Sequence, residues 1–424
     1  MNKISSAIIL TGFIFCTNIN TYAQEKITFS EAIDLAVKNN LEVQASYDEY
    51  KSSEYSKKIA QGNFLPKLSI GLSYENVDNE NSTGIATTND GYSASVSLTQ
   101  NLFNGFSDVA SLKLADSTIM TSEANLQESK SQISYDLKSS VANYFYAKES
   151  LTLSKDIRKR REDNLRMVEL RFENGRENKG SVLLSKAYLE QAKLDLVKAE
   201  NAMRVSRTFL NRVLNLPEES NIDITTSPEL AGLSSSTPDF NALSALTPEA
   251  KRFRASLLNA SATLQSDGSS LYPSWDVSAS VGKTGNDFFP DDNRRITAST
   301  GLTWAIFNGG KDFYSYNASK LLVKAAEKRL ENQNLELKRV LTTNYAAFEE
   351  AIASVNVSQA FLEAARVRSE IARSKYNNGL TNFDDWDIIE NDLISRQRDY
   401  TLKVRDRLIA QAAWEKSQGT GVIP

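Results

Sequence analysis

Four short segments of the chain alternate apolar residues with small polar ones. In the first, at about 67–76, one set of alternate positions is apolar and the other is small or polar: Leu68, Ile70, Leu72 and Tyr74 against Lys67, Ser69, Gly71 and Ser73. The same alternation occurs at about 92–102, 274–282 and 296–307. Because neighbouring side chains of a strand point to opposite faces, each segment predicts a β-strand with one apolar face and one small polar face.

A strand with this pattern fits two environments. Period-two alternation over about ten residues, with aromatic residues near the ends, is typical of a strand that crosses a membrane. A soluble hairpin half-buried against helices gives the same alternation. Agreement among four strands favours the membrane. The segments within each strand pair, 77–91 and 283–295, are rich in Asn, Asp and Gly and are expected to be water-facing loops.

The rest of the chain is mainly helical, so the predicted fold class is mainly α with membrane β-strands. Helices are expected at about 28–62 and 239–267, before Pro66 and Pro273. Two stretches, about 107–172 and 311–376, predict helices roughly 100 Å long. The second contains an apolar seam with heptad spacing: Leu341, Tyr345, Phe348, Ile352, Val355, Gln359 and Leu362. In the first, the seam of Leu137, Val141 and Tyr144 is broken at Lys148.

The chain is an internal duplication. "NLFNGF" at 101–106 and "AIFNGG" at 305–310 align at an offset of 204 residues. "RFENG", ending at Gly175, and "KYNNG", ending at Gly379, align at the same offset. We therefore predict two structural repeats, 24–215 and 251–424, joined by a linker at 216–250. Each repeat contains a helix, two strands, a long helix, a glycine turn and a returning helix, with the turns at 172–180 and 376–382.

Residues 1–23 have the features of a cleaved signal peptide. Lys3 supplies the positive start, an apolar stretch follows, and small residues end at Ala23. Cys16 follows Phe15, where a lipidation motif needs a small residue, so we expect cleavage after Ala23. No later stretch approaches eighteen consecutive apolar residues. The chain is therefore expected to be exported and to meet a membrane through its strands.

Composition excludes several function classes. The 424 residues carry a net charge of −4, which gives no indication of nucleic-acid binding. Histidine is absent and Cys16 is the single cysteine, so we expect no metal site, no cofactor and no enzyme activity. The chain also lacks the GxSxG and phosphate-loop motifs.

Four strands are too few to close a barrel in lipid, where unpaired backbone groups are very unfavourable. Other copies of the chain must therefore supply strands. Two copies would give eight strands with a filled interior, and three would give twelve with room for an aqueous lumen. The small polar face favours three. We predict a homotrimer whose twelve-stranded β-barrel, in contact with lipid, continues into a hollow cylinder of helices.

With these features the chain resembles the TolC-like outer-membrane efflux protein family. The resemblance covers almost the whole mature chain and is carried by "ITFSEAIDLAVKNNLEVQAS" at 27–46, the repeated Phe-Asn-Gly and the two glycine turns. It implies a homotrimer whose twelve-stranded β-barrel lies in outer-membrane lipid and continues into a long periplasmic α-helical barrel. It also implies a function, that of a passive exit duct for small molecules or secreted proteins. The implied partners are a periplasmic adaptor (membrane fusion) protein and an inner-membrane pump or ABC transporter, as in tripartite efflux or type I secretion. The linker resembles the family's equatorial region.

The resemblance also implies candidate functional residues at the periplasmic tip. The turn residues are candidates for adaptor contact, although they could serve only to form the turns: Arg171, Phe172, Asn174, Gly175, Lys375, Tyr376, Asn378 and Gly379. Two aspartates ring the entrance in the family's best-known member. The first matches Asp385 and the second falls on Ile388. Asp384, Asp387 and Glu390 are further candidates for the charge of a periplasmic gate, and a solvated acidic helix start is the simpler alternative.

Other functions remain open from the residues alone. A trimeric surface adhesin also combines strands with coiled coil, but its strands usually lie at one end of the chain. A structural coiled-coil protein without transport would not explain a small polar face on every strand.

Overall fold

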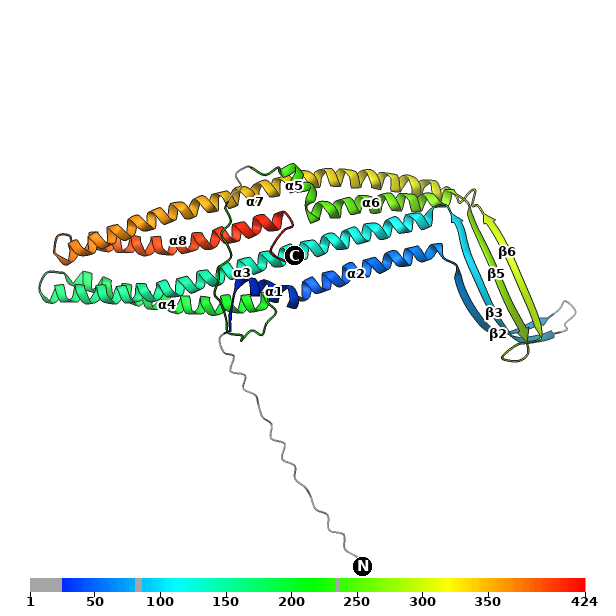
Figure 1. The fold of residues 1–424 in the computed structure, drawn as a ribbon, viewed down its shortest axis with the longest axis horizontal. Helices are drawn as coiled ribbons and strands as arrows, with labels where there is room; N and C mark the ends of the chain where they lie inside the picture. The colour runs from blue at the N-terminus through cyan, green and yellow to red at the C-terminus, as the bar shows by residue number, and fades with distance from the viewer. Residues whose placement is uncertain (1–24, 81–85, 233–236, 424) are drawn as a thin grey trace, which may run out of the picture.

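The computed structural model describes residues 25–80, 86–232 and 237–423 (Figure 1). The predicted signal peptide, 1–23, lies outside these residues. The elements are β1 Glu25–Ile27, α1 Phe29–Asn39, α2 Leu41–Gln61, η1 Gly62–Phe64, β2 Lys67–Glu80, β3 Ala86–Asn104, α3 Ser107–Glu173, α4 Lys179–Val213, β4 Ile222–Ile224, α5 Phe240–Leu246, α6 Pro248–Gly268, η2 Ser269–Leu271, β5 Ser274–Gly285, β6 Asn293–Thr303, α7 Lys311–Asn377 and α8 Phe383–Ser417.

The molecule is long, with the four-stranded sheet at one end and two helical turns at the other (Figure 1). The helices α3 and α7 run from the sheet to the turns, and each is 67 residues long. Next to the sheet they are accompanied by α2 and α6, and near the turns by α4 and α8. The described ends of the chain lie near the middle of the long axis. Within the described residues, no helix is both long enough and apolar enough to cross a membrane.

The duplication governs helix length. Both bounds of α7 equal those of α3 with 204 added, and the bounds of α8 relate to those of α4 in the same way. The long helices lie within one residue of the ranges expected from the sequence. Equal lengths bring the two turns to the same end of the molecule, where residues from both repeats meet.

The two shorter helical stretches are each broken once. The first divides into α1 and α2 at Asn40, whose side-chain oxygen accepts hydrogen bonds from the backbone N–H groups of Glu42 and Val43. The second divides into α5 and α6 at Thr247, which caps a helix that starts with Pro248. An Asn or Thr cap followed by a new first turn restarts a helix in a new direction. The predicted linker, 216–250, accordingly contains β4, α5 and the first residues of α6.

The sheet is antiparallel throughout, with strand order β2-β3-β5-β6. The strands differ in length from the alternating segments. Pairing between β2 and β3 continues from Asn76↔Asp90 to Glu80↔Ala86, so both strands extend into the expected loop. At the other end β6 stops at Thr303, four residues before the end of the alternation at Phe307. Its partner β5 begins at Ser274, directly after Pro273, so residues 304–307 have no strand to pair with.

The register places residues of one kind in rows across all four strands. One face has the rows Leu68–Leu98–Ala279–Ala298 and Ile70–Val96–Val281–Ile296. The opposite face has the row Ser69–Ser97–Ser280–Thr297. Neither face is covered by helices: the side chains of Leu68 and Ile70 are 68% and 74% exposed in a single chain. The sheet therefore has an uncovered apolar face, and the soluble hairpin packed on helices does not describe it.

The repeated Phe-Asn-Gly is a turn from strand to helix. Gly105 and Phe106 have φ angles of 65° and 71°, and the corresponding Gly309 and Gly310 have 60° and 77°. Two successive left-handed residues reverse the chain before α3 and α7 begin. Glycine adopts this region without the steric penalty of a β-carbon.

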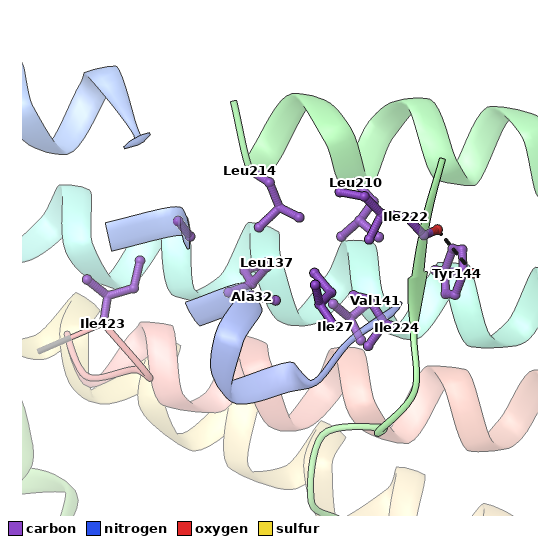
Figure 2. Close-up of a cluster of buried hydrophobic side chains, with 11 residues drawn as sticks. Ile27, Ala32, Leu137, Val141, Tyr144, Leu210, Leu214, Ile222, Ile224 and Ile423 are labelled. Carbon is purple, nitrogen blue, oxygen red and sulfur yellow. Dashed lines mark hydrogen bonds between the residues drawn. The ribbon is translucent and has the colours of Figure 1, made fainter. Parts of the chain in front are cut away.

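An apolar core lies where the chain ends meet α3 and α4 (Figure 2). Its buried side chains come from β1, α1, α3, α4, β4 and the C-terminal residues: Ile27, Ala32, Ala36, Leu137, Val141, Tyr144, Leu210, Leu214, Ile222, Ile224 and Ile423. Each fully buried aliphatic side chain contributes about 1.5–3 kcal/mol. β1 and β4 form a parallel pair here, and the linker is thereby fixed against the first repeat.

The break in the heptad seam at Lys148 has a structural reason. The Nζ atom of Lys148 lies 2.6 Å from Oδ1 of Asp223 in β4, and the hydroxyl of Tyr144 donates to the same oxygen at 2.8 Å. The seam instead buries Ala147. In α7 the prediction that Gln359 lies in the seam is wrong: Gln359 is exposed, and Ser358 is buried in its place. A small residue there keeps the spacing of three and four and lets the neighbouring helix approach closely.

The two Phe-Asn-Gly turns provide a matched test. A β-carbon at Gly105 would lie 2.3 Å from the carbonyl oxygen of Ser269, whereas one at Gly309 would meet no atom within 4 Å. We expect Gly309→Ala to lower the free energy of unfolding by about 1 kcal/mol through backbone strain. Gly105→Ala should lower it by about 2–4 kcal/mol, because crowding adds to the same strain. Thermal unfolding followed by circular dichroism would measure both, and equal losses would contradict this account.

Candidate functional site at the helical tip

The two long helices end in the same hydrogen-bonded turn. The N–H of Gly175 donates to the carbonyl of Phe172 at 2.9 Å, and that of Arg176 donates to the carbonyl of Arg171 at 2.8 Å. The bonds from Gly379 and Leu380 in the second repeat have the same spacing. Gly175 and Gly379 have φ angles of 67° and 73°, which this C-terminal motif requires.

The amide groups of Asn174 and Asn378 also close the last turns. Each Nδ2 donates to the carbonyl four residues earlier, to Leu170 at 2.6 Å and to Ser374 at 2.9 Å. Both asparagines are exposed, as are the two turn glycines. These four predicted tip residues therefore have a role in forming the turns and are also accessible at the surface.

The two turns differ in the side chain that precedes them. Tyr376 is fully buried, whereas its repeat counterpart Phe172 is 43% exposed. The ring of Tyr376 stacks on Trp386 with centroids 4.5 Å apart. On the ring of Tyr376 lies the guanidinium of Arg171, 4.4 Å from the centroid, which also donates to the carbonyl of Tyr376 at 2.6 Å. Arg171 and Tyr376 thus join the two turns to each other, while Phe172 and Lys375 point to the surface.

The hydroxyl of Tyr376 has a fixed acceptor. It donates to Oε2 of Glu177, in the first turn, at 2.7 Å. Burial of the ring raises the pKa of Tyr376 far above its ordinary value, and the bond to Glu177 raises it further. Tyr376 therefore stays protonated and keeps donating across the physiological pH range.

The four predicted gate acids lie in two different environments. Asp384 and Asp385 are exposed in the first turn of α8, whose start is capped by Asn382. Asp387 and Glu390 are buried against α3. The structure therefore brings the four acids onto one helix but not onto one face.

Glu390 is the centre of a buried polar network. Its carboxylate accepts two hydrogen bonds from Arg160 of α3, at 2.6 and 2.8 Å, and one from Ser369 of α7 at 2.6 Å. Asn164 adds a weaker bond at 3.4 Å. Burial alone would raise the pKa of Glu390, but the bonds and charge of Arg160, with Ser369, outweigh it and hold the pKa below 4.5. The ionised carboxylate thus joins three helices, α3, α7 and α8.

Asp387 is held less firmly. Its nearest cation is Arg161, with Nη1 to Oδ1 at 3.6 Å, and Asn391 donates to Oδ2 at 2.9 Å. Burial raises the pKa of Asp387 despite the nearby Arg161. The guanidinium of Arg161 also lies 4.5 Å from the ring centroid of Tyr188 in α4. Asp387 and Arg161 therefore connect α8 to both helices of the first repeat.

The network breaks the symmetry of the duplication. At the offset of 204, Arg160 and Arg161 correspond to alanines in α7, and Asp387 and Glu390 correspond to Leu183 and Lys186 in α4. The first repeat thus contributes the cations of this network, Arg161 buried and Arg160 partly buried, and the second contributes the buried anions. The sequence reasoning considered only the acids. The run of four basic residues at 158–161, on the helix before the first turn, was a signal that could have indicated their partners.

Ile388 is also notable on α8. It lies one turn beyond Asp385, and its side chain is 67% exposed, unlike that of any other large apolar residue described on this helix. Among the described residues, no group of three or more acidic side chains is placed to hold a metal ion.

Comparison with known families gives a match over both repeats. The model of the outer membrane efflux protein family matches residues 32–216 and 243–420. The chain belongs to the outer membrane efflux protein family. No curated protein matches the sequence.

Solved structures agree on the fold of this efflux protein. VceC from Vibrio cholerae superposes with a TM-score of 0.81 at 16% identity, covering 93% of this chain and 96% of VceC. The Campylobacter jejuni outer membrane channel CmeC superposes with a TM-score of 0.81 at 15% identity, covering 93% of this chain and 86% of CmeC. The open-state channel MtrE of Neisseria gonorrhoeae superposes with a TM-score of 0.76 at 18% identity, covering 93% of this chain and 89% of MtrE. At these identities the likeness shows the fold alone.

Family membership confirms the function class predicted from the sequence. The protein is an outer-membrane efflux channel, with a mainly helical, TolC-like fold that extends into the periplasm. It is a transport protein and not an enzyme. Channels of this TolC-like family are trimers that work with adaptor and pump partners. The adhesin and the structural coiled-coil alternatives are thereby wrong.

Two conservative substitutions distinguish the buried acids. We expect Glu390→Gln to lower the free energy of unfolding by about 3 kcal/mol, because the partly buried Arg160 loses its only anion within the described network. Asp387→Asn should lower it by less than about 1 kcal/mol, because burial already disfavours the charge of Asp387. Urea denaturation at pH 7 would measure both.

The pH dependence supplies the control. A carboxylate whose pKa is lowered on folding contributes stability that is complete above its unfolded value, here 4.5, and is lost as the pH falls through the folded value. The deficit of Glu390→Gln should therefore be constant from pH 7 to about pH 5 and shrink toward pH 3. A deficit that does not change below pH 4 would show that the charge of Glu390 is not the cause.

Proposed function

We propose that three copies of this chain form one exit duct across the outer membrane and much of the periplasm. The observation that carries the proposal is the four-stranded sheet with an uncovered apolar face and two open edges, β2 and β6. In lipid, β6 of one copy pairs with β2 of the next, which satisfies the backbone groups of both edges and closes a barrel of twelve strands. Lipid then covers the apolar rows, and the serine and glycine rows line the lumen.

The small polar lumen supports passive transport. Hydroxyl pairs such as Ser69–Ser97 and Ser278–Ser299, with oxygens 2.7 and 2.8 Å apart, satisfy one another and present little bulk. A twelve-stranded barrel with such a lining leaves an aqueous passage. The energy for export comes from an inner-membrane pump or ABC transporter, joined to this channel by a periplasmic adaptor.

The exposed part of α8 forms the periplasmic gate. Asp384, Asp385 and Ile388 lie on its uncovered side near the turn. About a threefold axis, three copies bring the like-charged carboxylates of Asp384 and Asp385 together, and this ring attracts cations. One turn further along α8, three Ile388 side chains form an apolar constriction of the passage. Asp387 and Glu390 act behind this ring: through Arg160 and Arg161 they hold α8 on α3 and so fix where the exposed residues stand.

The adaptor binds the two turns of the tip. Phe172 and Lys375 are exposed beside the accessible Asn174, Gly175, Asn378 and Gly379, and Leu380 is 74% exposed. An apolar contact with a polar rim, built on two rigid turns, suits docking of another protein. Arg171 and Tyr376 support this surface from inside, because their cation–π contact joins the turns.

Planar-bilayer recording tests the proposed duct. Purified protein should migrate as a trimer before heating and give discrete conductance steps after insertion. Single cysteines at edge positions of β2 and β6 should crosslink neighbouring copies. Trimers without conductance, or monomers that conduct, would reject the duct formed between copies.

The gate is tested in the same recordings. We expect Asp385→Ala to raise the single-channel conductance or the open probability at least about twofold, because like charges no longer hold hydrated cations in the entrance. Asp399→Ala, on the same helix about four turns from Asp385, is the matched control and should conduct like the wild type. Equal conductance of all three proteins would remove Asp385 from the gate.

A further inference from the structure

The polar face of the sheet carries a positive charge, Arg295, in a row of glycine and serine. Of the side chains described on this face, the titratable ones are those of Lys67, Glu75, Asp276 and Arg295. Lys67 and Asp276 lie in adjacent rows near the helical end of the sheet. Arg295 lies in the row Gly71–Ser95–Gly282–Arg295, near the middle of the sheet.

Its charge is not cancelled by the other charges on the face. The nearest acids in strand spacing are Asp292, three residues before Arg295 and about 10 Å along the chain, and Glu75, four residues beyond Gly71 on β2 and about 13 Å along the strand. Both distances exceed the Debye length of about 8 Å at physiological ionic strength. Within the described residues Arg295 has no ion-pair partner, and it is exposed.

The row gives this side chain free space. A β-carbon at Gly71 would meet only the hydroxyl of Ser95, at 3.2 Å, and one at Gly282 would meet only Ser95 and the carbonyl oxygen of Ala94. Glycine or serine at every other position of the row leaves the long arginine as its only large side chain. The arginine is therefore the charged side chain in the rows of small residues between Lys67 and Glu75.

The preceding residue, Arg294, lies on the opposite face. Its register row is Leu72–Ala94–Lys283–Arg294, directly beyond the apolar row of Ile70 and Ile296. Two neighbouring arginines therefore divide between the lumen face and the lipid face. This gives Arg295 a control with the same chemistry, one residue away.

We propose that Arg295 is a selectivity residue of the channel: three copies form a cationic ring in the lumen that favours anionic solutes. The proposal rests on the proposed trimeric duct, because one copy supplies only one charge. Rings of arginine are a general means of attracting anions in pores. The β-barrel then favours anions, whereas the acidic gate at the tip favours cations. An anion is therefore attracted at the outer-membrane end of the duct and not at the periplasmic end.

Reversal potentials in a potassium chloride gradient test the ring. We expect Arg295→Gln to raise the ratio of potassium to chloride permeability at least about twofold, and Arg295→Glu to raise it further, because three charges at one level of the lumen act on each passing ion. Arg294→Gln should leave the ratio unchanged. The shift should shrink at high salt, where a lumenal charge is screened.

Chemical modification of a single cysteine tests the ring independently, in case the arginine variants fail to assemble. In the Cys16→Ser background, Arg295→Cys should recover the wild-type ratio after reaction with a cationic thiosulfonate and move away from it after an anionic one. An unchanged ratio in Arg295→Gln, or an equal shift in Arg294→Gln, would overturn the ring. Wild-type protein that never conducts would instead reject the duct itself.

Discussion

An open sheet edge in lipid is the constraint on which the rest of this molecule depends. A backbone N–H or carbonyl without a partner is costly in hydrocarbon, and a four-stranded sheet with an apolar face leaves a whole row of them on β2 and on β6. Each chain therefore needs neighbours to complete the wall. Once neighbours complete the wall, the proposed duct encloses the small polar face as the lining of its passage.

The helical part meets a different requirement, that of reaching across the periplasm without a globular core. Two helices of 67 residues pack against their neighbours through thin seams of small and apolar residues rather than around a wide interior. The broad apolar cluster lies at the middle, where both described ends of the chain and the β1–β4 pair fasten the repeats together (Figure 2). The tip has a smaller apolar cluster around Tyr376 and Trp386, and specific polar contacts join its helices.

At the tip the duplication becomes useful because its copies are no longer alike. Equal helix lengths bring the two turns together, and divergence then places Arg160 and Arg161 on one repeat opposite Asp387 and Glu390 on the other. Buried ion pairs add little net stability, but they penalise any arrangement that separates their partners. Such pairs suit a site where one helix must be held in a defined position against two others.

Much of this structure was determined by the sequence alone. Alternation with a period of two predicted the strands and their faces, and the offset of 204 residues predicted the repeats. Sequence motifs that resemble the family indicated the efflux channel. Each of these is a pattern along the chain that can be recognised without knowing which residues come into contact. Only the tertiary structure decided which acids on α8 are buried and that Tyr376 is buried while Phe172 is exposed. It also decided that Lys148 forms an ion pair with Asp223. Those outcomes depend on contacts between residues some 75 to 230 positions apart, whose partners are set by the packing of helices and not by spacing along one of them.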